Sequence, residues 1–175
     1  MEVSLDLIKE LRHRTSASIA QCKKALEESK GNIKEAAEIL RKRGLEIALK
    51  SASSGVPREG RIESYVHLGN KIGVLLEVNC DTDFVARNED FIQFNKDISM
   101  QIAACNPSFL KKEDVPAATL KGEKDKEEFY KNQCLLEQPF VKDPSIMVKD
   151  YLGSLVAKLS ENISIRRFVR YKIGE

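Results

Sequence analysis

The chain has 175 residues, of which 42% are hydrophobic and 32% are charged, and its formal net charge is +2. This balance is typical of one or two small globular domains, and it disfavours both a largely disordered chain and a strongly basic nucleic-acid binder. No apolar run approaches the roughly 18 residues that cross a bilayer. Because residues 1–6 also lack the charged-then-apolar pattern of a secretory leader, we expect a cytoplasmic protein with no membrane partner.

The side chains that most often support metal or thiol chemistry are four cysteines and two histidines: Cys22, Cys80, Cys105, Cys134, His13 and His67. The cysteines form no C-x-x-C pair, so we expect no zinc site and free thiols, several of them buried. Phosphate-binding glycine motifs, the G-x-S-x-G nucleophile motif and the H-E-x-x-H metal motif are absent from the sequence. The sequence therefore predicts a protein that is not an enzyme and has no cofactor or metal.

Residues 1–50 are predicted to form three short helices, because apolar residues recur at helical spacing in three successive stretches. Gly31 is suited to end the second helix and Asn32 to cap the third. Residues 51–57 (SASSGVP) are small, polar and rich in helix breakers. This composition predicts a linker to a second domain over residues 58–175.

Two strands are predicted after the linker, from apolar residues at even-numbered positions within residues 62–68 and 72–78. A two-residue loop would put these two apolar sets on opposite faces of the sheet, whereas a three-residue loop or a bulge would put them on one face. We expect the second arrangement, with residue 68 opposite residue 72. Leu75 lies on the other face of the second strand, which indicates that this strand is covered on both sides.

Helices are predicted from Asn88 to about Cys105, where Pro107 ends the pattern, and from a cap at Ser145 through Lys158. Residues 111–128 are dense in charge, which indicates a loop or a solvated helix. The fold class is therefore α+β: an N-terminal three-helix module, then a small antiparallel three-stranded sheet packed with helices.

The last predicted strand runs from Ile163 to Ile173 and must pair with the hairpin, because alone it would leave an open edge. Strict alternation assigns its residues to two faces, Ile163, Ile165, Val169 and Tyr171 on one and Arg166, Arg170 and Lys172 on the other.

The segment from Asp81 to Asn88 (DTDFVARN) follows a strand and precedes a helix, and it has two interpretations. In the first, Phe84 covers the core while Asp81 or Asp83 caps a helical turn. In the second, a protruding tip offers one aromatic ring and one carboxylate to a partner. The residue pattern alone leaves both open.

Several segments together resemble the signatures of the elongation factor Ts family. They are Leu11–Arg12 with Thr15 and Ala17, Cys22–Glu27, Leu40–Gly44, Glu77–Asn88, Gln138–Phe140 and Asn162–Phe168. The resemblance covers nearly the whole chain. It implies a guanine-nucleotide exchange factor that binds elongation factor Tu, both GDP-bound and nucleotide-free, with no covalent step.

The resemblance also implies two sets of partner-binding residues. The N-terminal module, similar to ubiquitin-associated (UBA) domains, would dock on the GTPase domain of elongation factor Tu through Leu11, Arg12, Thr15 and Lys23. A loop would intrude next to the nucleotide and disturb the Mg²⁺ and phosphate site through Thr82, Asp83, Phe84 and Val85.

The chain resembles the short form of the family, because the stretch from Lys111 to Leu135 is too short for the duplicated core and coiled coil of long members. Short members tend to form homodimers, so residues 58–175 are expected to form a dimerisation core. The family usually has glycines at the positions of Ser16 and Ser18 and an acid at Gln21. We therefore expect the docking surface of the module to differ in detail.

Two other functions fit parts of the sequence. The helical module alone is compatible with an adaptor that binds ubiquitin-like or peptide partners. The cations of the last strand (Arg166, Arg167, Arg170 and Lys172) are compatible with an RNA-binding accessory protein. Few aromatic residues lie beside them for base stacking, so no direct nucleic-acid contact is expected.

Overall fold

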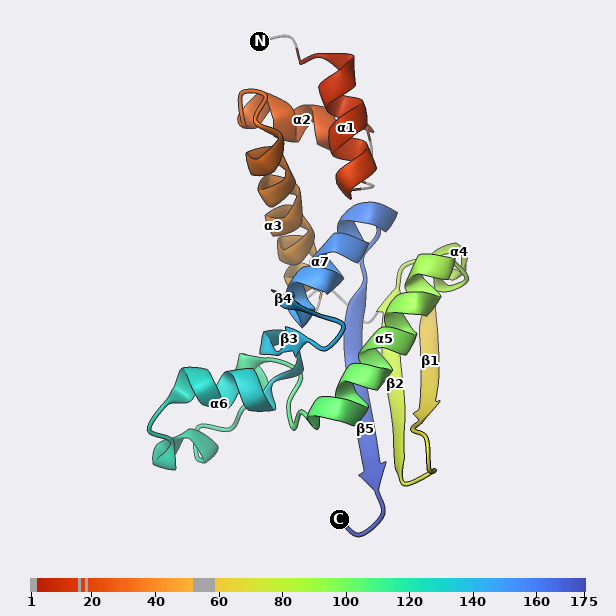
Figure 1. Ribbon diagram of the computed structural model, residues 1–175, viewed down its shortest axis with the longest axis vertical. Coiled ribbons are helices and arrows are strands. Elements are labelled where there is room, and N and C mark those ends of the chain that lie inside the picture. The colour runs from red at the N-terminus through yellow and green to blue at the C-terminus, as the bar shows by residue number, and fades with distance from the viewer. Residues whose placement is uncertain (1–2, 16, 18, 52–58) are drawn as a thin grey trace.

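The computed structural model places three helices at one end of an elongated molecule and a sheet with its helices toward the other (Figure 1). It describes residues 3–15, 17, 19–51 and 59–175. The predicted linker, apart from Ser51, lies outside the described residues, as do Ser16 and Ser18. The α+β fold class is confirmed.

The N-terminal module consists of α1 (Leu5–Thr15), α2 (Ile19–Glu28) and α3 (Ile33–Ser51). Asn32 caps α3 as predicted, since its side-chain oxygen accepts the backbone N–H groups of Lys34 and Glu35 at 3.1 and 3.3 Å. The module has a core of its own, made by Ile8, Leu11, Ala17, Cys22, Ala25, Leu26, Ala36 and Leu40.

The sheet contains β1 (Glu59–Val66), β2 (Ile72–Cys80) and β5 (Ser164–Lys172) in the order β1-β2-β5, with both pairs antiparallel. The predicted pairing of the last strand with the hairpin is confirmed. Helix α5 (Glu89–Cys105) covers one face of the sheet, and α7 (Val148–Leu159) packs beside it. The largest fully buried side chains of this core are Phe91, Phe94, Leu76, Ile98, Ile102, Leu135 and Ile163.

The register of the hairpin differs from the prediction. Val66 pairs with Gly73, and the N–H of His67 donates to the carbonyl of Ile72, so residue 68 lies opposite 71 rather than 72. The loop closes in this register because Gly69 and Asn70 both adopt positive φ, +89° and +57°.

As a consequence, the two apolar sets lie on opposite faces of the sheet. Val74, Leu76 and Val78 of β2 are buried under the helices. Ile62, Val66 and Leu75, by contrast, are exposed on the other face, at 68%, 62% and 48%. The prediction that β2 is covered on both sides is therefore wrong for the single chain.

A bulge in β5 corrects the predicted faces of the last strand. Val78 pairs with Ile165 and Glu77 pairs with Arg167, so Arg166 is an extra residue that reverses the alternation. Ile165 is therefore buried, whereas Val169 and Tyr171 lie on the exposed face, at 38% and 70%.

An outlying arm joins α5 to α7 (Figure 1). Its elements are η1 (Lys112–Asp114), η2 (Thr119–Gly122), α6 (Lys126–Gln133), η3 (Leu135–Glu137), β3 (Pro139–Phe140) and β4 (Asp143–Met147). The prediction of a loop or solvated helix for residues 111–128 matches the short elements there. The predicted cap at Ser145 is wrong, because Ser145 lies in β4 and α7 starts only at Val148, where Asp150 accepts the N–H of Met147.

The module and the core meet where α3 lies alongside α7 (Figure 1). Arg41 of α3 forms an ion pair with Asp150 of α7, and Glu38 holds the other end of the same guanidinium at 2.9 Å. At the other end of α7, the hydroxyl of Ser160 donates to the side-chain oxygen of Gln21 at 3.4 Å. The three-helix unit therefore contacts both ends of α7.

Candidate partner-binding site

The segment between β2 and α5 forms a single helical turn, α4 (Asp83–Ala86), which we call the tip together with its cap Thr82. The Thr82 hydroxyl accepts the N–H of Val85 at 3.3 Å, and its carbonyl accepts the N–H of Ala86 at 3.2 Å. The cap is thus Thr82, rather than Asp81 or Asp83. The helix predicted from Asn88 is present as α5, and Asn88 itself is its cap, accepting the N–H of Asp90 at 2.8 Å.

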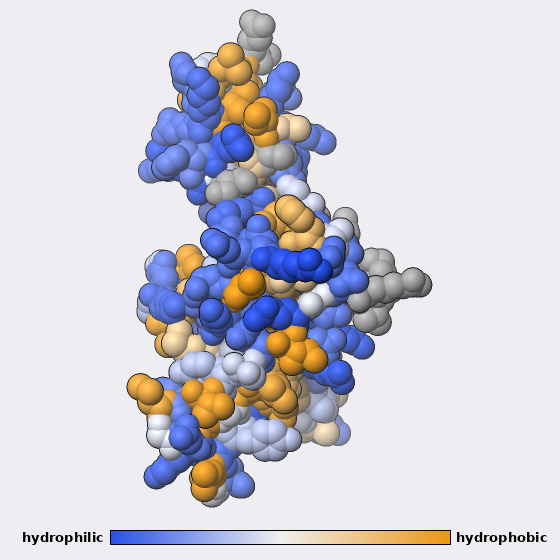
Figure 2. Space-filling view, turned by 90° about the vertical axis from the view of Figure 1, so that its right-hand side faces the viewer, coloured by the Kyte–Doolittle hydropathy of each residue, from blue (hydrophilic) through white to orange (hydrophobic). Residues whose placement is uncertain are grey.

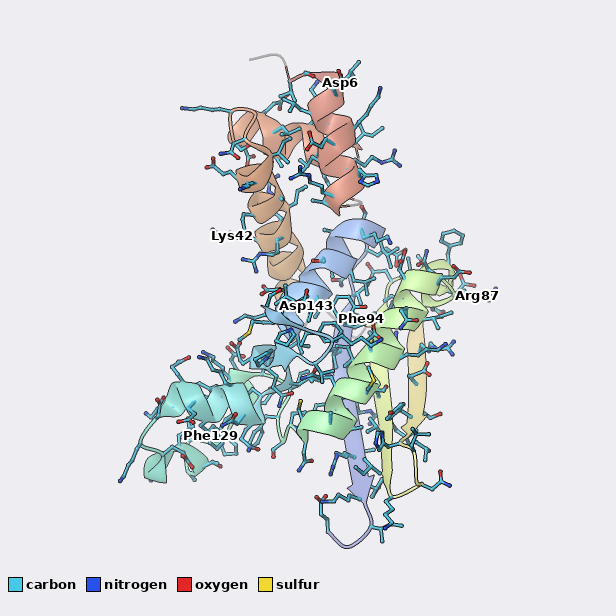
Figure 3. All side chains as sticks on the ribbon, viewed as in Figure 1. Asp6, Lys42, Arg87, Phe94, Phe129 and Asp143 are labelled. Carbon is cyan, nitrogen blue, oxygen red and sulfur yellow. The ribbon has the colours of Figure 1, made fainter. Side chains whose placement is uncertain are left out.

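Phe84 points away from the core and is 79% exposed. Its exposure excludes the interpretation in which this ring covers the core of the single chain. Asp83 is also exposed, and its carboxylate forms an ion pair with Arg87 one turn later at 2.9 Å. Arg87 lies at the outer edge of the molecule beside α4 (Figure 3). The tip therefore presents one ring and one carboxylate to solvent, close to the N-terminal end of α5.

Val85 has the opposite environment. It is 4% exposed and belongs to the hydrophobic core, where it packs among the side chains of β2 and α5. Its side chain is an anchor for the tip and is not on the surface that a partner would meet. Of the four tip residues predicted as partner contacts, Asp83 and Phe84 present their side chains outward, and Thr82 is occupied as the cap.

Cys80 and Glu161, to which the sequence analysis gave no role at the tip, also hold Thr82. The Cys80 thiol donates to the Thr82 carbonyl at 3.1 Å, and burial raises the pKa of this thiol to about 11, so it stays protonated at neutral pH. The Glu161 carboxylate accepts the Thr82 hydroxyl at 2.5 Å and the Thr82 N–H at 3.2 Å. Because Glu161 is 79 positions away in the chain, no local pattern could have indicated this contact.

In the N-terminal module, the predicted contact residues differ in accessibility. Arg12 and Lys23 are exposed, and Lys23 lies 4.0 Å from Glu27. Leu11 is fully buried in the module core. Thr15 is half-buried and donates its hydroxyl to the Leu11 carbonyl at 2.8 Å. Leu11 and Thr15 therefore shape the module from within.

A groove on the module lies beside Arg12. It has a volume of about 560 Å³ and is lined by Leu5, Ile8, Lys9, Arg12, His13 and Ile19. Leu5 and Ile19 are 72% and 59% exposed and line the same groove, so they are not isolated exposed side chains. Hydrophobic side chains also gather at this end of the molecule in Figure 2. Helical spacing alone does not tell which apolar residues of a module remain exposed, so this apolar rim is a feature that sequence reasoning missed.

The exposed face of the sheet is a second apolar surface, which we call the open face; it consists of Ile62, Val66, Leu75, Val169 and Tyr171. A shallow depression of about 380 Å³ lies on it and is lined by residues of all three strands. At its edge, Arg167 of β5 and Glu77 of β2 form an ion pair at 2.6 Å.

Within the described ranges, no group of three or more histidine, cysteine, aspartate or glutamate side chains is placed to hold a metal ion. Nor does any helix in those ranges combine the length and apolar character that a bilayer crossing requires.

The fold and the tip define an α+β protein that displays a helical module and an anchored aromatic turn from a small sheet. A family model described as Elongation factor TS matches residues 2–128 and 125–175. The chain belongs to the elongation factor Ts family.

Similar proteins named Elongation factor Ts come from several bacteria. The protein of Carboxydothermus hydrogenoformans is 44% identical over 99% of this chain and 90% of its own length. That of Thermodesulfovibrio yellowstonii is 45% identical over 100% and 98%, and that of Methylacidiphilum infernorum is 47% identical over 99% and 96%. These alignments span 194 to 197 positions against 175 residues here, so the relatives carry residues without a counterpart in this chain. The two segments of the family match meet at residues 125–128, at the start of α6 in the outlying arm.

Proposed function

We propose that this protein is a guanine-nucleotide exchange factor that binds elongation factor Tu in its GDP-bound and nucleotide-free states. Membership of the elongation factor Ts family supports the class of activity and the partner. The single structural observation that carries the proposal is Phe84, a large apolar side chain held 79% exposed on a turn whose neighbouring residues are anchored. Its site of action is the cytoplasm, where translation elongation takes place.

In the proposed mechanism, Asp83 and Phe84 intrude beside the bound nucleotide and disturb the coordination of its Mg²⁺ and phosphates. A GTPase holds these groups with the metal and with backbone N–H donors, so a small displacement weakens several contacts at once. Burial of one phenylalanine contributes roughly 1.5–3 kcal/mol. At about 1.4 kcal/mol per tenfold change, Phe84 alone accounts for about one to two decades of faster GDP release.

The remaining acceleration requires a wider interface, which we assign to the N-terminal module. The module is proposed to dock on the GTPase domain as a UBA-like unit. Arg12 and Lys23 supply exposed charge, and the groove between Leu5 and Ile19 supplies apolar area. Coupling between the two ligands is reciprocal, so GDP weakens the binding of this protein to the GTPase by the same factor.

We also propose that two copies of the chain associate through the open face. Single chains rarely expose contiguous apolar surface on a sheet, and packing two such faces together would bury it as in a sheet sandwich. A disulfide through Cys134 does not fit this dimer, because Cys134 is fully buried near the arm. In this organisation residues 1–50 dock on the partner and residues 58–175 form the dimerisation core.

The RNA-binding alternative gains no support from the position of its cations. The bulge in β5 separates them between the two faces of the sheet. Arg167 is paired with Glu77, and Arg170 and Lys172 are both paired with Glu175.

The test of the proposed function is stopped-flow release of fluorescent GDP from elongation factor Tu, with and without the full chain. We expect release to accelerate with protein concentration and then saturate, as it does when a ternary complex forms. A release rate that does not depend on the protein would overturn the proposal.

A further inference from the structure

We propose that Glu161 is a positioning residue of the exchange tip, which it holds through both polar donors of Thr82. The expected effect of Glu161 on GDP release rests on the proposed function. The contact itself is a property of the free chain and is tested separately.

One carboxylate accepts two hydrogen bonds from Thr82. Glu161 lies in the turn between α7 and β5 and accepts the Thr82 hydroxyl at 2.5 Å and the Thr82 backbone N–H at 3.2 Å. Hydrogen bonds to an ionised acceptor are about twice as strong as neutral ones. Because one donor is on the backbone and the other on the side chain, the pair fixes both the chain direction and the rotamer of the cap.

The Thr82 hydroxyl connects the hydrogen bonds to Glu161 with the cap of the helical turn. A hydroxyl has one hydrogen to donate and two lone pairs to accept with. Donation to Glu161 leaves a lone pair for the N–H of Val85, which the same oxygen accepts at 3.3 Å. Without the carboxylate, the hydroxyl hydrogen has no fixed acceptor and the cap of α4 weakens.

The turn needs such external support because α4 has only four residues. Isolated helices of this length are unstable in water, since nucleation is unfavourable and there are too few bonds to offset it. Contacts outside the turn hold it: Val85 and Ala86 pack on the core, the Cys80 thiol donates to the Thr82 carbonyl, and Glu161 accepts the Thr82 donors. Among these polar contacts, the one from Glu161 comes from the distant turn after α7.

The same turn also touches the N-terminal module. Ser160, which caps the end of α7 with a φ of +56°, donates its hydroxyl to Gln21 of α2 at 3.4 Å. The consecutive residues Ser160 and Glu161 therefore contact the N-terminal module and the tip, the two parts of the chain that are proposed to bind elongation factor Tu. Glu161 thereby relates the orientation of Phe84 to a helix against which the module packs, and holding a contact group in place before binding reduces the cost of ordering it.

The experiment compares Glu161→Gln and Glu161→Ala with Lys158→Gln in the full chain. Lys158 is the matched control because it forms an ion pair from α7 to α5, with Asp90 at 2.6 Å, close to the tip but without contact to Thr82. The first readout is amide hydrogen exchange of the tip in the free protein. We expect the Glu161 variants to exchange the Thr82 amide at least about tenfold faster, whereas Lys158→Gln does not. Unchanged tip exchange in both Glu161 variants would overturn the proposal.

The second readout is stopped-flow GDP release over a range of factor concentrations. We expect Glu161→Ala to lower the saturating release rate about tenfold or more, because the ring reaches the nucleotide site less often, with a smaller change in the half-saturating concentration. Faster amide exchange at the tip together with an unchanged saturating rate of GDP release would also overturn the proposal. If the wild-type chain itself does not release GDP, the proposed function fails, while hydrogen exchange still decides the contact.

Variants of Thr82 separate the loss of these hydrogen bonds from a general loss of packing. Thr82→Ser keeps both donors and is expected to keep the protection of the tip amides. Thr82→Val has a similar shape but no hydroxyl, and it is expected to lose that protection. In a double variant of Glu161→Ala and Thr82→Val, the loss should be smaller than the sum of the two single losses, because both changes remove the bond between the hydroxyl and the carboxylate. Thr82→Val alone also removes the acceptor of the Val85 N–H, so it is expected to have the larger single effect. Fully additive losses would show that the two residues act independently and would contradict the proposal.

Discussion

Phe84 and Val85 are consecutive residues with opposite environments: the phenylalanine is 79% exposed and the valine is 4% exposed. One helical turn thus has an outward ring and an inward anchor. This pair separates the contribution of the tip to partner binding from its contribution to stability.

Phe84→Ala is expected to slow factor-dependent GDP release by about one to two decades, the equivalent of roughly 1.5–3 kcal/mol, and to leave the melting temperature within about 1 °C. Val85→Ala is expected to lower the free energy of unfolding by about 1–3 kcal/mol through a cavity in the core. Stopped-flow release and thermal unfolding measure the two effects. If Phe84→Ala melts much earlier than the wild type, the ring supports the fold and is not a partner contact.

The open face predicts the oligomeric state. Leu75 and Val169 are paired neighbours on β2 and β5, exposed at 48% and 38%. Replacing both by lysine places like charges at the centre of the proposed interface, which is expected to convert a dimer into monomers. Sedimentation at micromolar concentration measures the change.

The matched control is Val141→Lys. Val141 is 43% exposed in the turn between β3 and β4, off the open face, so its replacement is expected to leave the dimer intact. A wild-type chain that sediments as a monomer would contradict the interface, and so would a double-lysine variant that remains a dimer.

A substitution in the groove of the N-terminal module is expected to weaken binding to the partner and to leave the action of the tip unchanged. Ile19→Asp introduces a charge at the exposed rim of the groove and is expected to weaken binding to elongation factor Tu by roughly 1.5–3 kcal/mol, the value of one buried aliphatic side chain. Binding is measured as the half-saturating concentration in GDP release, and the saturating rate should change little. Equal binding by Ile19→Asp and the wild type would remove the groove from the interface.

The cysteines predict a selective pattern of alkylation. Burial raises the pKa of the Cys80 and Cys134 thiols to about 11, so both are protonated at pH 8 and also inaccessible. Desolvation raises the pKa of the Cys105 thiol as well, but Cys105 is exposed and can be reached by a reagent. Iodoacetamide at pH 8 is expected to modify Cys105 first, as seen by peptide mass spectrometry. Because thiolate is the reactive form, the rate at Cys80 should rise between pH 9 and 11. Rapid modification of Cys134 in the native protein would contradict its buried position.

Local signals in the sequence determined much of this protein. Helical periodicity, the cap Asn32 and the family signatures depend on residues that are close in the chain, so the three-helix module, α5 and the tip segment could be located from the sequence alone. These signals work because capping and amphipathic patterns act over three or four residues.

Tertiary structure decided which faces these elements present. Positive φ at Gly69 and Asn70 determined the hairpin register, and the extra Arg166 reversed the faces of β5. Each shift by one residue moves every side chain to the other side of a sheet. The contact between Glu161 and Thr82 depended on bringing together positions 79 apart. Such pairings depend on how the whole chain packs, which no short window of sequence contains.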